Sequence, residues 1–181
     1  MGPDCGRSRA ARHPPGVAGV EVRPCRVEEA VTLAFEPEAF PARFGLQLAA
    51  GWAVPGALEP TVDALEGGID PAWLTHLIVE GETVVGMGGF TGPPCDGEVE
   101  IGYQVAPGYR GRGIATGAVR TWVARARAAG VRRVVARTDP GADASARVLE
   151  RAGFVRDPVR DDPVRDPGRG DTAHWWRLDL A

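Results

Sequence analysis

The segment from Glu98 to Ala129 constrains the fold of this 181-residue chain more than any other. Glu98 to Val105 alternates polar and apolar side chains, as a half-buried β-strand does. A turn rich in glycine and arginine follows, and Ile114 to Ala129 then places its apolar residues on one face at helical spacing. A strand that leads through a glycine-rich turn into a long amphipathic helix predicts an α/β domain with a ligand site at the turn.

Strands and helices are predicted on both sides of this segment. The predicted strands are 20–23, 75–80, 83–90, 98–105, 131–138, 154–156 and 172–180, and the predicted helices are 27–35, 114–129 and 143–152. The strand after the long helix should run parallel to its neighbour, because a helical crossover precedes it. The expected fold is α/β in the α+β sense, with a mixed, mostly antiparallel sheet of about six or seven strands flanked by helices on both faces.

The length and composition indicate one globular domain. Hydrophobic residues make up 44% of the chain and charged residues 25%, and no apolar run approaches the roughly 20 residues of a membrane span. We expect residues 1–19 to be a disordered leader and residues 20–181 to form the domain. The expected location is the cytoplasm, without membrane contact. Residues 36–71 are rich in proline, glycine and aromatic residues and allow no firm assignment beyond a helical turn or two at 61–66.

Charge and cysteine content exclude several functional classes. The net charge is −3 and every one of the 21 basic residues is arginine, which gives no support for nucleic-acid binding; only the arginine–glycine cluster keeps an RNA-binding alternative open. The three cysteines, Cys5, Cys25 and Cys95, are widely spaced, so neither a disulfide framework nor a metal site is expected.

The turn from Ala106 to Gly113 has the features of an anion site. Its glycines let the backbone approach a ligand, and the following helix N-terminus offers unpaired N–H groups and the positive end of the helix dipole. Arg110 and Arg112 would add charge-assisted hydrogen bonds, and the ligand we expect is a diphosphate. Neither a P-loop nor a dinucleotide-binding fingerprint is present.

The run Arg110-Gly-Arg-Gly-Ile-Ala115 resembles the Arg/Gln-x-x-Gly-x-Gly/Ala signature of the GNAT N-acetyltransferase superfamily. Residues 145–154 resemble the second helix and strand start of its ribosomal-protein N-terminal acetyltransferase branch. The resemblance implies transfer of an acetyl group from acetyl-CoA to the amine of a small molecule or protein N-terminus, without a metal. The sequence leaves the oligomeric state open, with a homodimer as one alternative. The residues that the resemblance implies in cofactor binding are Gln104, Val105, Arg110, Gly111, Arg112, Gly113, Ile114, Ala115 and Ser145.

The catalytic groups are predicted by analogy with the same family. Glu100 is the candidate general base, because family members use a carboxylate on this strand; the alternative is a solvated or salt-bridged carboxylate. Leu149 stands where many members carry a tyrosine, so protonation of the departing thiol would come from solvent or from Tyr103. A second departure from the family pattern is Ala142, which stands where asparagine is common. Because of Leu149 and Ala142, a catalytically degenerate acyl-CoA-binding or sensor module stays open as the alternative.

Two further groups of residues have open roles. We interpret four aromatic residues either as the lining of an acceptor pocket or as part of the core: Trp52, Trp73, Phe40 and Phe44. Residues 156–161 are echoed by 162–167, which indicates a duplicated, solvated loop, with a role in substrate access as the alternative.

Overall fold

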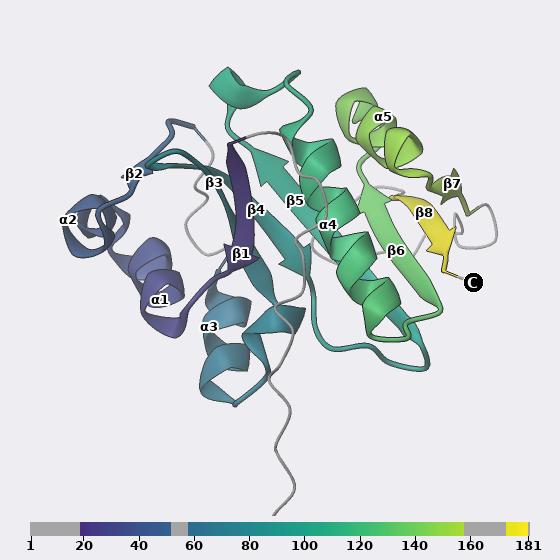
Figure 1. The fold of residues 1–181 in the computed structure, drawn as a ribbon, viewed down its shortest axis with the longest axis horizontal. Helices are drawn as coiled ribbons and strands as arrows, with labels where there is room; N and C mark the ends of the chain where they lie inside the picture. Colours follow the sequence, from purple (N-terminus) through teal and green to yellow (C-terminus); the bar gives the residue numbers. More distant parts are fainter. Residues whose placement is uncertain (1–18, 52–57, 158–172, 181) are drawn as a thin grey trace, which may run out of the picture.

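The computed structural model describes residues 19–51, 58–157 and 173–180, and a β-sheet forms its centre (Figure 1). The strands are β1 (Val20–Pro24), β2 (Gln47–Leu48), β3 (Thr75–Glu80), β4 (Thr83–Phe90), β5 (Glu98–Val105), β6 (Arg133–Thr138), β7 (Val155–Arg156) and β8 (His174–Asp179). Seven follow the order β1-β3-β4-β5-β6-β8-β7, and β2 pairs with β4. The pairs β5–β6 and β2–β4 are parallel and the others antiparallel. The mixed, mostly antiparallel sheet is therefore confirmed, with β2 as the strand that the sequence did not predict.

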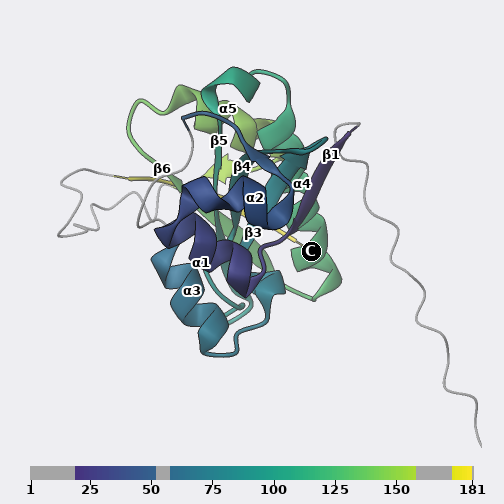
Figure 2. The same ribbon diagram turned by 90° about the vertical axis from the view of Figure 1, so that its left-hand side faces the viewer.

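Helices cover both faces of the sheet, as expected. They are α1 (Val27–Phe35), α2 (Phe40–Phe44), α3 (Glu59–Glu66), α4 (Ile114–Ala128) and α5 (Asp143–Ala152), and short 3-10 turns occupy 37–39, 71–73 and 107–109. α4 and α5 pack on one face, and α1 and α3 on the other (Figures 1 and 2). No helix among the described residues is long and apolar enough to span a membrane.

The region between α1 and β3 contains α2, α3 and β2, of which the sequence predicted only the helical turns at 61–66 that belong to α3. Pro41 and Pro60 each lie in the first turn of a helix. Proline lacks the backbone N–H, but a first-turn residue has no intrahelical partner for that group. These prolines therefore mark helix starts, although in the sequence they resemble helix breakers.

Each sheet face has its own hydrophobic core because side chains alternate along a strand. On β3, Ile78 belongs to the core beneath α4 and α5, whereas Leu77 and Val79 belong to the core beneath α1 and α3. Trp122 of α4 is fully buried in the first core and Phe40 in the second. The two cores fix the sheet between the helix layers and thereby position the turn that precedes α4.

Candidate active site

The two parallel strands at the centre of the sheet separate before they end. β5 and β6 are paired from Glu98 with Arg133 to Ile101 with Ala136. Beyond that point β5 stays paired with β4 as far as Val105, and β6 stays paired with β8 as far as Thr138. Within the described residues, the β5 segment from Gly102 to Val105 therefore has one edge without a strand partner.

The backbone groups on this open edge belong to alternate residues. The Thr91 N–H donates to the Glu100 carbonyl, and the Ala106 N–H donates to the Val85 carbonyl, so the even-numbered residues of β5 face β4. In a strand, successive residues direct their backbone groups to opposite sides. Tyr103 and Val105 consequently direct their N–H groups into the gap between β5 and β6, whereas the backbone of Gln104 faces β4 and only its side chain is available to a ligand.

The gap leads to the turn before α4. Gly111 has φ of 75° and Gly113 has φ of 80°, a left-handed region that favours glycine. Gly113 is the N-cap of α4, and no side chain caps this helix end. The N–H groups of the first turn of α4, including those of Ile114 and Ala115, therefore lack a capping side chain, while the Ile114 side chain is buried in the core.

The two arginines of the turn have different surroundings. Arg110 is exposed and its Nε donates to the Val105 carbonyl at 3.0 Å, which ties the turn to the end of β5. Arg112 is paired with Glu80 at 2.9 Å, and its guanidinium lies 5.4 Å from the centre of the Tyr109 ring. The Arg110 bond to Val105 uses only one of the five N–H donors of the guanidinium. Arg112, in contrast, would have to break its ion pair with Glu80, or bind Glu80 and the ligand together, to bind an anion.

Tyr103 connects β5 with α5 across the gap. Its hydroxyl donates to the carbonyl of Ser145 at 3.0 Å, and its side chain packs against the core beneath α4 and α5. Burial raises the pKa of Tyr103, so the phenol remains protonated at neutral pH. Leu149 is fully buried, so a side chain at this position points into the core and not into the gap.

Glu100 is held in an ion pair. Its carboxylate accepts a hydrogen bond from Nε of Arg137 at 2.8 Å, and the Arg137 guanidinium lies 5.3 Å from the centre of the Trp175 ring. The salt-bridged carboxylate that the sequence left open as an alternative is thus the arrangement in this structure. Glu100 is partly exposed and lies one residue before the end of β5–β6 pairing, next to the gap.

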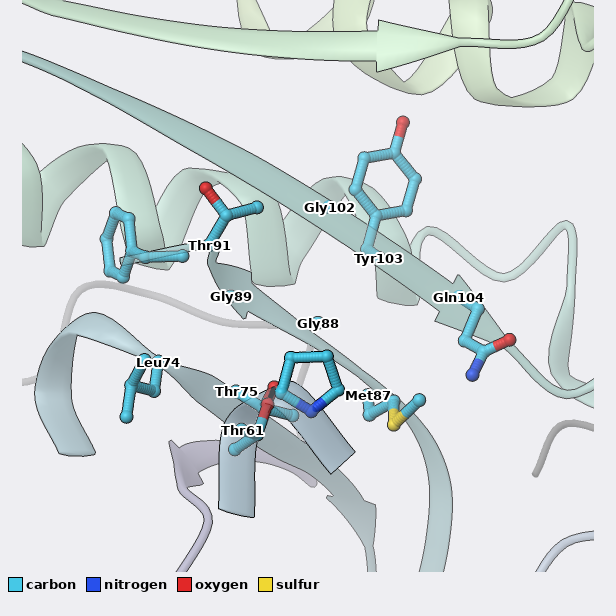
Figure 3. Close-up of a pocket in the computed structure, with 12 residues that line it drawn as sticks. Thr61, Leu74, Thr75, Met87, Gly88, Gly89, Thr91, Gly102, Tyr103 and Gln104 are labelled. Atoms are coloured by element: carbon cyan, nitrogen blue, oxygen red, sulfur yellow. Dashed lines mark hydrogen bonds between the residues drawn. The ribbon is translucent and has the colours of Figure 1, made fainter. Parts of the chain in front are cut away.

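A cavity of about 530 Å³ lies over β4 and β5 beside the gap (Figure 3). Gly89 and Gly102 are register partners on the two strands. The sheet surface is open at Gly102, where a Cβ would meet no atom within 4 Å, whereas a Cβ at Gly89 would lie 2.3 Å from the Leu74 carbonyl oxygen. The cavity is lined by Pro60, Thr61, Leu74, Thr75, Met87, Gly88, Gly89, Phe90, Thr91, Gly102, Tyr103 and Gln104. Figure 3 shows Tyr103 extending away from the side chains of Thr61, Thr75 and Met87. The sequence singled out Gly102 as leaving space beside Glu100, but it gave no signal for Gly89, which depends on strand register.

The aromatic residues proposed for the acceptor pocket have other roles where the structure describes them. Phe40 is fully buried, and its ring centre lies 4.7 Å from that of Phe44. Trp73 packs on Phe90 with ring centres 4.8 Å apart. Trp52 and most of the duplicated segment lie outside the described residues. The described part of the chain contains no group of three or more His, Cys, Asp and Glu residues able to hold a metal.

Residues 23–155 match the family model described as an acetyltransferase (GNAT) domain. The chain belongs to this family, and it is an acetyltransferase by that membership.

Solved structures with the same fold cover nearly the whole chain. The ribosomal-protein-S5-alanine acetyltransferase from Vibrio fischeri is 18% identical with a TM-score of 0.64, over 91% of this chain and 94% of that one. The protein yncA from Salmonella typhimurium, solved with acetyl-CoA, is 20% identical with a TM-score of 0.61, over 90% and 95%. A chimera of the spermidine N-acetyltransferase SpeG from Vibrio cholerae and hSSAT is 12% identical with a TM-score of 0.64, over 90% of this chain and 96% of that one. No curated protein matches the sequence.

Proposed function

We propose that this protein transfers the acetyl group of acetyl-CoA to a primary amine by direct attack of the amine on the thioester in a ternary complex. The observation that carries the proposal is the open edge of β5, which leads directly to the uncapped N-terminus of α4. One continuous set of backbone donors, from Tyr103 and Val105 to Ile114 and Ala115, is available to the thioester, the pantetheine arm and the diphosphate.

Each part of this donor set suits one part of the cosubstrate. The helix N-terminus and the glycine turn suit the diphosphate, and Arg110 supplies further charge-assisted donors. The N–H of Val105 can pair with a pantetheine amide as a neighbouring strand would. The N–H of Tyr103 lies deeper in the gap, where it can stabilise the negative charge that develops on the thioester oxygen.

The reaction needs a neutral amine, a place for its proton and a proton for the leaving thiolate. The amine nitrogen forms a bond to the acetyl carbon, the carbon–sulfur bond breaks, and the nitrogen loses a proton. Glu100 is the proposed acceptor of that proton, directly or through water, once its ion pair with Arg137 opens. Solvent or the protonated phenol of Tyr103 returns a proton to the sulfur.

The cosubstrate site is tested by thermal melting with acetyl-CoA. At about 100 times its dissociation constant, a ligand that binds the native state adds roughly 2.7 kcal/mol of stability, and each kcal/mol raises the melting midpoint of a chain of this size by about 2–4 °C. Arg110→Ala should weaken binding by on the order of 1.5–3 kcal/mol if the side chain bonds a phosphate.

Arg127→Ala is the matched control, because Arg127 is an exposed arginine at the opposite end of α4. It should leave the shift unchanged. Absence of any shift with acetyl-CoA or longer acyl-CoAs would contradict the proposal. A shift without thiol release across a broad amine panel would instead identify a binding module that has lost turnover.

A further inference from the structure

Arg137 occupies a position from which it can select the acceptor. It is the first residue of β6 after the last residue paired with β5, Ala136. Val134 and Ala136 pack in the core beneath α4 and α5, so alternation places Arg137 on the opposite sheet face, where Gly102 and Glu100 also lie. Arg137 is exposed and follows Ala136, the register partner of Ile101, so it lies across the gap from Gly102.

The neighbours of Arg137 fix the orientation of its guanidinium without occupying all of its N–H donors. Its Nε bonds Glu100 at 2.8 Å, its ring contact is with Trp175 at 5.3 Å, and the side chain is 46% exposed. A guanidinium has five N–H donors in a planar fork that matches a carboxylate, and the bond to Glu100 uses one of them. Arg137 is thus a pre-oriented cation that a carboxylate of a ligand can approach.

The cavity beside Arg137 is uncharged and partly apolar. Leu74, Met87 and Phe90 contribute apolar surface, and none of the residues that line the cavity is acidic or basic. A smaller hollow of about 330 Å³ adjoins it through the shared residue Thr91 and contains Glu98, Glu100 and Trp175. The site therefore offers an apolar surface, and beside it a carboxylate and a guanidinium that now pair with each other.

We propose that the acceptor is an α-amino acid with an apolar side chain, whose carboxylate binds Arg137 while its amine lies beside Glu100. The proposal rests on the acetyl transfer proposed above and names its acceptor class. Binding exchanges one ion pair for two: Arg137 moves from Glu100 to the ligand carboxylate, and the ligand ammonium takes the place of Arg137 next to Glu100. No charge remains unpaired, and Glu100 becomes adjacent to the proton that the reaction must remove.

The experiment measures thiol release from acetyl-CoA with matched acceptors. The acceptors are L-leucine and L-phenylalanine, each compared with its C-terminal amide, which retains the amine and the side chain but lacks the negative charge. We expect kcat/KM for the acids to exceed that for the amides by at least about tenfold, the lower end for a hydrogen bond to a charged group. Arg137→Gln should remove most of this preference through KM and leave the amides nearly unchanged.

Arg133→Gln is the matched control. Arg133 lies at the other end of the same strand and pairs with Glu98 and Asp179, away from the gap. It should keep the preference of the wild-type protein.

Amides acetylated as well as or better than acids, or a preference that survives in Arg137→Gln, would overturn the inference and leave the acetyl transfer standing. If none of these four acceptors releases thiol while another primary amine of the broad panel does, the acceptor class is refuted and the acetyl transfer stands. If no amine of the broad panel releases thiol, the transfer itself is refuted.

Discussion

A methyl group added at Gly102 tests whether the cavity over β4 and β5 binds the acceptor. A Cβ built at Gly102 meets no atom within 4 Å, and the residue is not among those with positive φ, so Gly102→Ala fits the backbone. In the unfolded chain, alanine has fewer accessible conformations than glycine. The variant should therefore be as stable as the wild-type protein or more stable by about 0.4–1 kcal/mol.

The same methyl group should impair the binding and acetylation of the acceptor. It projects from the cavity floor, one register position beyond the end of β5–β6 pairing, and so displaces a bound amine by about the length of a carbon–carbon bond. Misplacement by about 1 Å can cost on the order of 100-fold in rate. We therefore expect kcat/KM for the acceptor to fall by about 10- to 100-fold in a thiol-release assay, with a larger loss for bulkier acceptors. Calorimetry should give an unchanged affinity for acetyl-CoA, because the methyl group points away from the backbone donors of the gap.

Gly88→Ala provides the contrast on the opposite sheet face. A Cβ there would lie 2.5 Å from the Gly102 carbonyl oxygen and 2.6 Å from Cη2 of the buried Trp122. Gly88→Ala should therefore be strongly destabilised, whereas Gly102→Ala should not. A comparison of their melting midpoints distinguishes the two positions. Wild-type kcat/KM for every acceptor in Gly102→Ala would show that the amine binds elsewhere and would refute the reasoning.

Two further predictions concern titratable groups. Burial lowers the pKa of His76 to about 4, against an ordinary value near 6.5, and its Nδ1–H donates to the Leu74 carbonyl at 2.9 Å. Because the unfolded chain binds this proton more readily, stability should fall as the pH drops from about 6.5 to about 4, by on the order of 3 kcal/mol. The melting midpoint of His76→Phe should fall less over this window, and an equal fall in both proteins would exclude His76 as the cause. For the proposed base, Glu100→Gln should reduce kcat for the acceptor while the affinity for acetyl-CoA, measured by calorimetry, is kept. A wild-type kcat would exclude Glu100 from proton transfer.

Much of the fold could be predicted because it depends on local patterns. The predicted hairpin of β3 and β4 agrees with the structure residue for residue, as do α1 and α5, because side-chain periodicity and flanking glycine or proline report local backbone conformation. In the region before β3, the helical turns predicted at 61–66 are confirmed by α3, but α2 and β2 were missed because a first-turn proline resembles a helix breaker and because β2 has only two residues.

The candidate site also combines features that the local sequence indicates with contacts that only the fold brings about. The turn from Arg110 to Gly113 could be located from the sequence, because its glycines and the helix start that follows are local features; that it binds an anion stays a prediction. The ion pair of Glu100 with Arg137 could not, because the two residues are 37 positions apart and meet only through the register of β5 with β6.

The sequence by itself determined most of the strands and helices and the place of the glycine–arginine turn before α4, since both depend on residues close together in the chain. Only the tertiary structure decided where β5 and β6 separate, that Gly89 and Gly102 face each other, and which cation holds Glu100. These features depend on strand register, and register is fixed when the two cores pack on opposite faces of the sheet.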